Sequence, residues 1–325
     1  MRQPLLEICD LKVEYDTSKV QIMAVAGLSL KVGHREVVGL VGESGCGKST
    51  VAKAINRLIP SPPGRITGGR ISYKGRDLRN VSERIMRNIR GREIAQTFQD
   101  PMTYLNPVMK VRTQLMETIV THQGLSGPQA FDYTMELLEK IRIPSPSRIA
   151  DSYPHELSGG MRQRVLLTMA ISCNPSLLIA DEPTTALDVT IQLQILNLLK
   201  ESVADFQTSL IIITHDLGIV AEICDRVYVI YCGKVVEHGN VYQIFENPLH
   251  PYTQGLLRSA LSIAEFKEDL EAIKGAVPNM LSPPPGCTFH PRCPSCMDVC
   301  THRPPEIIQI EPDHQVACWL FSKNA

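Results

Sequence analysis

The segment GESGCGKST, at positions 42–50, has the residue types and spacing of a phosphate-binding loop, G-x-x-x-x-G-K-[ST]. Glycines allow backbone N–H groups to turn toward phosphate oxygens, a lysine adds positive charge, and a following hydroxyl can bind Mg²⁺. An apolar run precedes the loop and a helical pattern follows it, which disfavours an ordinary glycine-rich turn. The predicted nucleotide-binding residues are Gly42, Ser44, Gly45, Cys46, Gly47, Lys48, Ser49 and Thr50, with Ser49 also on Mg²⁺.

Two adjacent carboxylates, Asp181 and Glu182, end the apolar run in LLIADEP. An acid at the carboxyl end of a strand can hold Mg²⁺ through water. The next residue points to the other side of the strand and can orient and polarise an attacking water. A solvated turn is the alternative for two bare carboxylates, and a phosphate loop in the same chain disfavours it.

Three further segments have polar residues where nucleotide chemistry would need them. LSGGMRQR precedes an amphipathic helix, and its Ser158, Gly159 and Gly160 form a second candidate anion site. Because the chain already has a phosphate loop, a second anion site suggests a partner's nucleotide. Gln99 ends a strand in TFQDP and His215 ends one in IIITHD. A structural histidine is the alternative to a γ-phosphate sensor at His215.

The apolar patterns predict an α/β fold with a mainly parallel sheet and crossover helices. Strand-like segments lie at residues 5–15, 24–32, 36–42, 70–75, 93–98, 176–183, 209–216 and 226–239, and helices at about 48–59 and 190–206. The segment SPPGRITGG, at 61–69, reads as a loop because of its proline and glycine content.

The order of these patterns predicts two domains. Residues of about 105–165 have helical spacing and no strand-like run, so they form a helical subdomain within a first domain at 1–255. The composition changes after residue 255, where PNMLSPPPGC is too rich in proline for a helix or a central strand. Residues 256–325 are therefore expected to form a small, separate, cysteine-rich extension.

Composition excludes several classes of protein. The 325 residues are 43% hydrophobic and 21% charged, which fits a globular chain with a substantial core. A net charge of −1 offers no global field for nucleic acid, so no nucleic-acid partner is expected. The longest apolar runs are too short for a bilayer crossing, and the N-terminus lacks the pattern of a signal peptide. These features predict a cytoplasmic location.

Together and in this order, the motifs resemble the ATPase subunit of an ATP-binding cassette (ABC) transporter, over roughly residues 5–255. The resemblance implies a P-loop NTPase (RecA-like) core with the ABC α-helical subdomain, and ATP and Mg²⁺ as ligands. It implies that Tyr15 stacks on adenine and that Gln99 senses Mg²⁺ and reports to a membrane subunit. It also implies that Glu182 is the catalytic base, His215 the switch, and Lys48 a stabiliser of developing charge.

The resemblance also implies a dimer of ATPase subunits. Ser158 and Gly160 would contact the γ-phosphate bound by the opposite subunit, and Asp188 would lie at the interface. Three parts of the chain resemble the dipeptide/oligopeptide-importer subfamily, which includes nickel importers. They are the segments FENPLHPYTQGLL and FQDPMTYLNPV and the tail. The usual residue at position 104 is serine, where this chain has Tyr104.

The ten cysteines include five in the tail. The positions that match the subfamily are Cys287, Cys293, Cys300 and Cys318, and the resemblance implies a [4Fe–4S] cluster on them. Structural Zn²⁺ and free thiols are the second and third alternatives. Cys296 has no counterpart in the subfamily and is expected to be a spare. The nearby His290, His302 and His314 are possible ligands but are expected at the surface.

The function implied by the resemblance is ATP hydrolysis that powers import of di- or oligopeptides from the cytoplasmic face of the cell membrane. The implied partners are two transmembrane permease subunits, a second related ATPase subunit and an extracytoplasmic solute-binding protein. A nickel or other small-solute importer is the alternative, and a soluble ABC ATPase outside transport is a further one.

Overall fold

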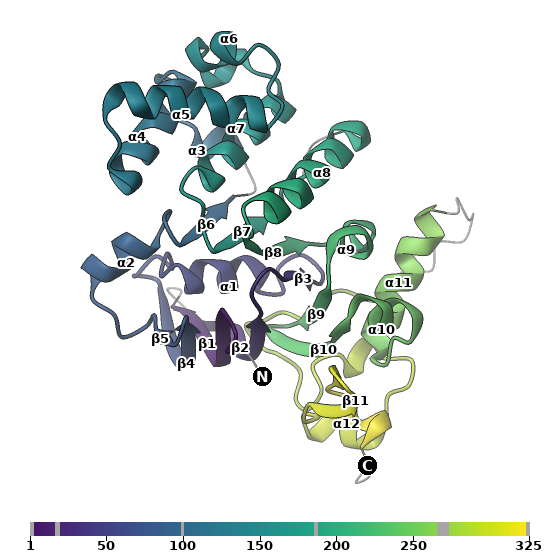
Figure 1. Cartoon of the computed structure of the whole chain (residues 1–325). Helices are drawn as coiled ribbons and strands as arrows, with labels where there is room; N and C mark the ends of the chain where they lie inside the picture. The colour runs from purple at the N-terminus through teal and green to yellow at the C-terminus, as the bar shows by residue number, and fades with distance from the viewer. Residues whose placement is uncertain (1–2, 17–19, 99–100, 185–187, 265–272, 323–325) are drawn as a thin grey trace. The chain divides into compact units, whose positions relative to one another are not determined.

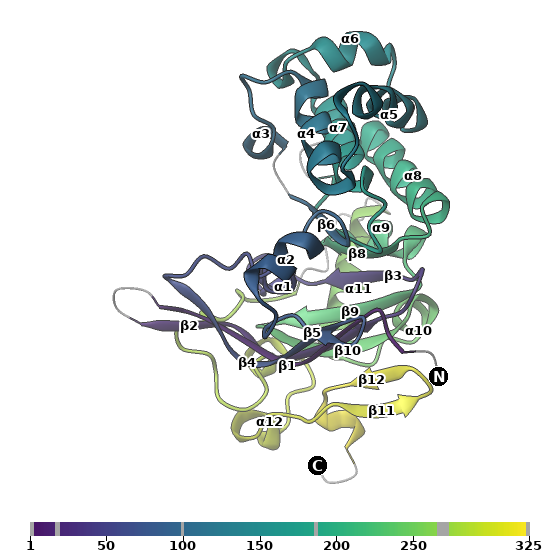
Figure 2. The same cartoon turned by 60° about the vertical axis from the view of Figure 1, so that its left-hand side comes forward.

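The computed structural model describes residues 3–16, 20–98, 101–184, 188–264 and 273–322 (Figures 1 and 2). The chain divides into two compact units, Met1–Asn80 with Ile213–Ala325, and Val81–Ile212. Strand β8 (Ser209–Thr214), entirely buried, contains the boundary between them. None of the helices in these residues has the length and apolar content that a bilayer crossing requires.

The first unit contains an antiparallel sheet in the order β2-β1-β4-β5. Its strands are β1 (Leu6–Asp16), β2 (Gln21–Val32), β4 (Gly64–Tyr73) and β5 (Arg76–Asp77). Alternating apolar residues of β1 and β2, such as Leu11, Val13 and Leu28, are buried. This period of two is the pattern that the sequence showed in both segments.

The loop predicted at 61–69 is wrong from Gly64 onward, because β4 begins there and pairs with β1. The pairing shifts register between Cys9 and Lys12, opposite the two glycines of ITGG. Gly69 adopts φ +81°, and a Cβ at this position would lie 2.4 Å from the backbone oxygen of Asp10. The glycines therefore permit a bulged strand where their content alone had suggested a loop.

A second set of strands in the first unit has the order β11-β12-β10-β9-β3. These are β3 (Val37–Val41), β9 (Arg226–Tyr231), β10 (Lys234–Asn240), β11 (Ile308–Glu311) and β12 (His314–Val316). β3 and β9 are parallel, whereas β9, β10, β12 and β11 pair antiparallel. The helices of this unit are α1 (Lys48–Ile55), α9 (Leu217–Ile223), α10 (Val241–Glu246), α11 (Pro251–Ala264) and α12 (Asp298–His302), with 3₁₀ turns η2 (His290–Arg292) and η3 (Trp319–Phe321).

The second unit has a parallel strand pair and a group of helices (Figure 1). Its strands are β6 (Ile94–Thr97) and β7 (Leu177–Asp181). Its helices are α2 (Glu83–Ile89), α3 (Pro101–Tyr104), α4 (Val111–Gln123), α5 (Gly127–Lys140), α6 (Pro146–Asp151), α7 (Gly159–Ile171) and α8 (Val189–Asp205), with η1 (Pro154–Glu156). Helices α4 to α7 pack on one another, and α7 also packs on β6 and α8. The predicted helical character of about 105–165 is confirmed.

Helix α1 is shorter than predicted, ending at Ile55 instead of residue 59. Arg57 then adopts a left-handed backbone with φ 50°, which stops the helical hydrogen-bond pattern. Helix α11 crosses residue 255, and β12 of the tail pairs with β10, so the tail strands extend a sheet of the first unit.

His314 of the tail is completely buried, so its predicted surface position is wrong. Its Nε2 lies 2.9 Å from Oε1 of Glu237, a carboxylate that is also completely buried. The backbone N–H groups of Leu249 and His250 donate to the same carboxylate at 2.8 and 2.9 Å. Three donors therefore satisfy a buried acid that would otherwise be costly. His302 is exposed as expected, and His290 is half-buried.

His250, 2% exposed, makes the first unit sensitive to acid. Burial lowers the pKa of its imidazole to about 3, below its ordinary value of 6.5. The unfolded chain therefore takes the proton first, and stability falls as the pH drops below 6.5, until about pH 3. We expect this residue to make the protein about 1.4 kcal/mol less stable at pH 5.5 than at pH 7.5.

The change His250→Asn should remove this contribution, because asparagine does not titrate. An asparagine can still accept the N–H of Tyr252, which the ring Nδ1 now accepts at 3.0 Å. Urea unfolding at the two pH values measures the effect, with His302→Asn at an exposed position as the control. An unchanged pH dependence in His250→Asn would contradict the prediction.

Candidate functional site

The predicted phosphate loop joins strand β3 to helix α1 in the first unit. β3 is mostly buried and pairs in parallel with β9, which fixes the start of the loop. Gly47 adopts φ +101°, and a Cβ there would lie 2.4 Å from the backbone oxygen of Ala24. Only glycine fits such a position without moving the neighbouring strand. The strand, loop and helix predicted from the sequence are thus confirmed in this order.

The N-terminus of α1 is shaped to receive an anion. Its N-cap residue, Gly47, has no side chain that could accept the N–H groups of the first turn. A Cβ at Gly45, φ +80°, would meet nothing within 4 Å, so there is open space next to this residue of the loop. Open space next to the positive end of a helix suits phosphate oxygens.

Lys48 is 5% exposed and is held by the loop itself. Its ammonium donates to the carbonyl oxygens of Gly42 at 2.7 Å and Glu43 at 2.9 Å, and lies 3.6 Å from Sγ of Cys46. Burial raises the pKa of the Cys46 thiol, so this thiol stays neutral beside the ammonium. The ammonium of Lys48 therefore lies inside the loop, bonded to two of its carbonyl oxygens.

Two other predicted site residues belong to the first unit. Tyr15, half-buried at the end of β1, pairs across the sheet with Ile22 and Gly64. A Cβ at Gly64 would lie 2.7 Å from Cε1 of Tyr15, so glycine leaves room for the ring. His215 follows β8 and is exposed, directly before Asp216, the N-cap of α9.

The predicted carboxylates end strand β7 in the second unit. Every residue of β7 is buried, and Asp181 is 5% exposed. Glu182 is half-buried and adopts φ 47°, a left-handed backbone that residues other than glycine seldom adopt. The strand therefore ends between the two acids. A strained backbone next to a candidate active residue is consistent with a functional constraint.

The LSGG segment opens helix α7 in the same unit. The hydroxyl of Ser158 caps the helix and accepts the N–H of Met161 at 3.4 Å, while Gly159 and Gly160 form the first turn. A Cβ at Gly160 would lie 2.6 Å from Ile191, so this glycine allows close approach of α8. Asp188 caps α8 by accepting the N–H of Ile191 at 3.0 Å. The two helix starts predicted to face a partner subunit are thus adjacent.

Gln99 lies outside the described residues, as do positions 185–187. The strand that leads to Gln99, β6, is described and pairs with β7 from Ile94↔Leu177 to Thr97↔Ala180.

Four of the tail cysteines, Cys287, Cys293, Cys300 and Cys318, are partly or fully buried. Burial, with a smaller contribution from the neighbouring thiols, raises the pKa of Cys318 to about 11. The N–H of Cys287 donates to the carbonyl of Cys300 at 2.8 Å. All are free thiols, and Cys296 is exposed. In the part of the chain that the structure describes, no three His, Cys, Asp or Glu side chains are gathered as a metal site. The predicted metal centre therefore has no support from this geometry.

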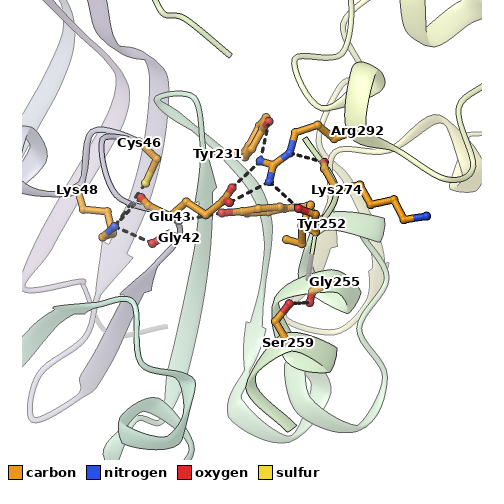
Figure 3. A network of polar contacts seen from close by, with 11 residues as sticks. Gly42, Glu43, Cys46, Lys48, Tyr231, Tyr252, Gly255, Ser259, Lys274 and Arg292 are labelled. Carbon is orange, nitrogen blue, oxygen red and sulfur yellow. Dashed lines mark hydrogen bonds and ion pairs between the residues drawn. The ribbon is translucent and has the colours of Figure 1, made fainter. Parts of the chain in front are cut away.

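The sequence interpretation missed the ion pair between Glu43 and Arg292 (Figure 3). Glu43 is a variable position of the phosphate-loop pattern, and Arg292 lies among the tail cysteines. Tyr231 and Tyr252 complete the same network. No local pattern marks these residues, because their partners are up to 249 positions away.

Two family descriptions match the chain. Residues 25–185 match the family described as ABC transporter, and residues 236–300 match the oligopeptide/dipeptide transporter C-terminal region. The second match covers most of β10, all of α11 and the first three of the four predicted ligand cysteines, so it includes part of the tail.

Known relatives are similar over nearly the full length. The oligopeptide transport ATP-binding protein OppD of Bacillus subtilis is 46% identical over 99% of this chain and 90% of that protein. The dipeptide transport ATP-binding protein DppD of the same organism is 45% identical over 99% and 96%. Among solved structures, a post-hydrolysis dimer of the ATP-binding cassette MJ0796 with ADP and Pi is 25% identical. The match covers 73% of this chain and 98% of the MJ0796 chain, with a TM-score of 0.65.

Proposed function

The chain belongs to the ABC transporter family, among the oligopeptide and dipeptide transport ATP-binding proteins, and we propose from this premise that it powers uptake of di- and oligopeptides. Hydrolysis of ATP is the activity of this family's cassette. The observation that carries the peptide proposal is the 46% identity to an oligopeptide transport protein over 99% of the chain. The matching C-terminal region supports the same cargo.

We propose the following roles at the ATP site. Lys48 and the first-turn N–H groups of α1 bind the phosphates, and Tyr15 stacks on adenine. Ser49, Gln99 and Asp181 would hold Mg²⁺, which would offset charge on the phosphoryl oxygens. Glu182 orients the attacking water and accepts its proton, and His215 responds to the γ-phosphate. Support comes from the open, glycine-lined loop and from the buried strand that presents the acids.

We also propose that two ATPase subunits share two ATP molecules. Ser158, Gly159 and Gly160 of one subunit contact the nucleotide on the phosphate loop of the other, with Asp188 beside them. The exposed start of α7 and its contact with α8 support this role. The second subunit is a related but different ATPase. At the cytoplasmic face of the membrane the pair works with two permease subunits, which also serve an extracytoplasmic binding protein.

We also propose that the chain has two domains. The first is 1–255, with a helical subdomain of about 105–165, and the second is 256–325.

Reconstitution tests the cargo. The chain is combined with its permeases, partner ATPase and binding protein in vesicles, and uptake of a labelled dipeptide, a labelled pentapeptide and ⁶³Ni²⁺ is measured with and without ATP. We expect ATP-dependent uptake of at least one peptide. Uptake of nickel without either peptide would contradict the peptide proposal and favour the nickel alternative.

We retain a metal on Cys287, Cys293, Cys300 and Cys318 as a proposal, with iron–sulfur ahead of zinc. Four cysteine thiolates are a ligand set that both an iron–sulfur cluster and zinc accept, although the described side chains are not gathered as a metal site. Iron, acid-labile sulfide and zinc are measured on protein purified without oxygen. We expect about four iron and four sulfide per chain. Zinc without sulfide would replace the cluster by a structural Zn²⁺, and the absence of all three would leave free thiols.

A further inference from the structure

Glu43 of the phosphate loop is held by an arginine of the tail (Figure 3). Nη1 of Arg292 lies 2.7 Å from Oε2 of Glu43, and Nη2 lies 2.9 Å from Oε1. The arginine side chain is 4% exposed and the glutamate side chain 27% exposed. A two-bond pair between planar groups fixes orientation as well as distance. Because the pair is largely shielded from water, it is screened less than a surface ion pair.

Arg292 has further contacts that keep it in this position. Its Nε donates to the carbonyl of Lys274 at 3.1 Å, and Nη1 also donates to the hydroxyl of Tyr231 at 3.3 Å. The guanidinium lies 5.9 Å from the centre of the Tyr231 ring. Every nitrogen of the guanidinium therefore has a partner, and the side chain cannot turn away from Glu43 without losing several hydrogen bonds.

The backbone of Glu43 is held at the same time. Its N–H donates to the hydroxyl of Tyr252 at 2.9 Å, and its carbonyl accepts the ammonium of Lys48 at 2.9 Å. Tyr252 is completely buried against Tyr231 and Phe289, with ring centres 4.6 and 5.3 Å away. The residue beside the first glycine of the loop is thus fixed through its side chain and its backbone by groups outside the loop.

The segment that carries Arg292 is itself anchored. Phe289 is 1% exposed and packs into the same aromatic group. The N–H of Arg292 donates to the carbonyl of Phe289 at 3.0 Å, and that of His290 donates to the carbonyl of Cys287 at 2.9 Å. The short turn η2, which contains Arg292, therefore directly follows the buried Phe289.

We propose that Arg292 is a positioning residue for ATP binding. By holding Glu43, it keeps the loop, and the carbonyl that accepts Lys48, in a binding-ready arrangement before the nucleotide arrives. A loop without this anchor must be ordered during binding, and this lowers affinity. The inference rests on the proposed role of residues 42–50 as the phosphate loop, and assigns to the tail a share in setting ATP affinity.

The test compares Arg292→Gln with Arg292→Lys in the assembled transporter. We expect Arg292→Gln to raise the KM for ATP, and the Kd for a non-hydrolysable ATP analogue, by about tenfold, with kcat at saturating ATP within twofold of wild type. Arg292→Lys should recover part of the affinity, because an ammonium can make one of the two bonds. The matched control is Arg303→Gln, another tail arginine, which stacks on Trp319 instead of reaching the loop.

A double-mutant cycle with Glu43→Gln separates positioning from general stability. We expect the double variant to bind ATP no more weakly than Arg292→Gln alone, since both changes break the same pair. Fully additive losses, or a Kd and KM within twofold of wild type in folded Arg292→Gln, would overturn the inference. If Arg292→Gln does not fold, the same binding measurements are made on Glu43→Gln and Tyr252→Phe. Each change removes a contact that holds residue 43 and leaves Arg292 unchanged.

The same assays distinguish this inference from the proposed phosphate loop. A Lys48→Met variant that binds ATP normally would contradict the phosphate loop itself. A defective Lys48→Met variant together with normal Arg292→Gln and Glu43→Gln variants would contradict only the positioning role.

Discussion

A transporter with Glu182→Gln is expected to bind ATP with nearly wild-type affinity and to hydrolyse it at least about a hundredfold more slowly. The change keeps the size of the side chain and removes its ability to accept a proton. Because the backbone at this position has φ 47°, a residue of similar shape also avoids new backbone strain. Affinity for the ATP analogue and steady-state phosphate release, measured on the same preparation, give the two quantities.

The control for this variant is Glu201→Gln on helix α8 of the same unit. Glu201 forms an exposed ion pair with Arg142 at 3.0 Å, a contact that contributes little to stability. We expect its hydrolysis rate to match wild type. If Glu182→Gln hydrolysed ATP at a rate close to that of Glu201→Gln, the assignment of Glu182 as the base would be wrong.

The parts of the fold that the sequence predicted well are those whose cause is local. Strand β3, the glycine-rich loop and helix α1 follow one another within 20 residues, and each leaves its own pattern. The same holds for β7, which is apolar until its acidic end, and for the start of α7, where Ser158 caps the helix. Such features need no distant partner, so residue types and spacing are enough.

The features that the sequence did not predict depend on partners far along the chain. Arg292 and Glu43 are 249 positions apart, and neither has a neighbour that marks it as part of an ion pair. The surface position predicted for His314 is wrong for the same reason. Its partner Glu237 is 77 positions earlier, on a strand that the tail joins through β12. Burial of polar groups is decided by such pairings and not by local composition.

The loop predicted in place of strand β4 is wrong for a related reason. Its glycines predict a loop when the segment is considered alone, but β1 is long enough to pair with it from Gly64 to Tyr73. Pairing with a long neighbouring strand outweighs local propensity in sheets, where contacts across strands provide most of the stability. The tail cysteines show the same dependence on tertiary contacts. Their positions can be found in the sequence, but their spacing does not determine how they are arranged in space.

The ammonium of Lys48 is the group whose loss should affect ATP binding most. In the structure this ammonium donates to two carbonyls of the loop, those of Gly42 and Glu43. Lys48 is also the one cationic side chain in residues 42–50. Phosphate would replace or share these carbonyl contacts. A charged hydrogen bond contributes about 1.5–3 kcal/mol, which corresponds to about a tenfold to hundredfold change in affinity.

We therefore expect Lys48→Met to weaken binding of the ATP analogue by about tenfold to hundredfold and to reduce hydrolysis below detection. Methionine fills a similar volume, so the buried position is not left empty. Lys53→Met, in the last turn of the same helix, changes the same residue type away from the loop and should bind ATP normally. Since Glu182→Gln is expected to keep its affinity, the two variants together separate binding from hydrolysis. Equal affinity of Lys48→Met and Lys53→Met would show that the charge inside the loop does not hold the phosphates.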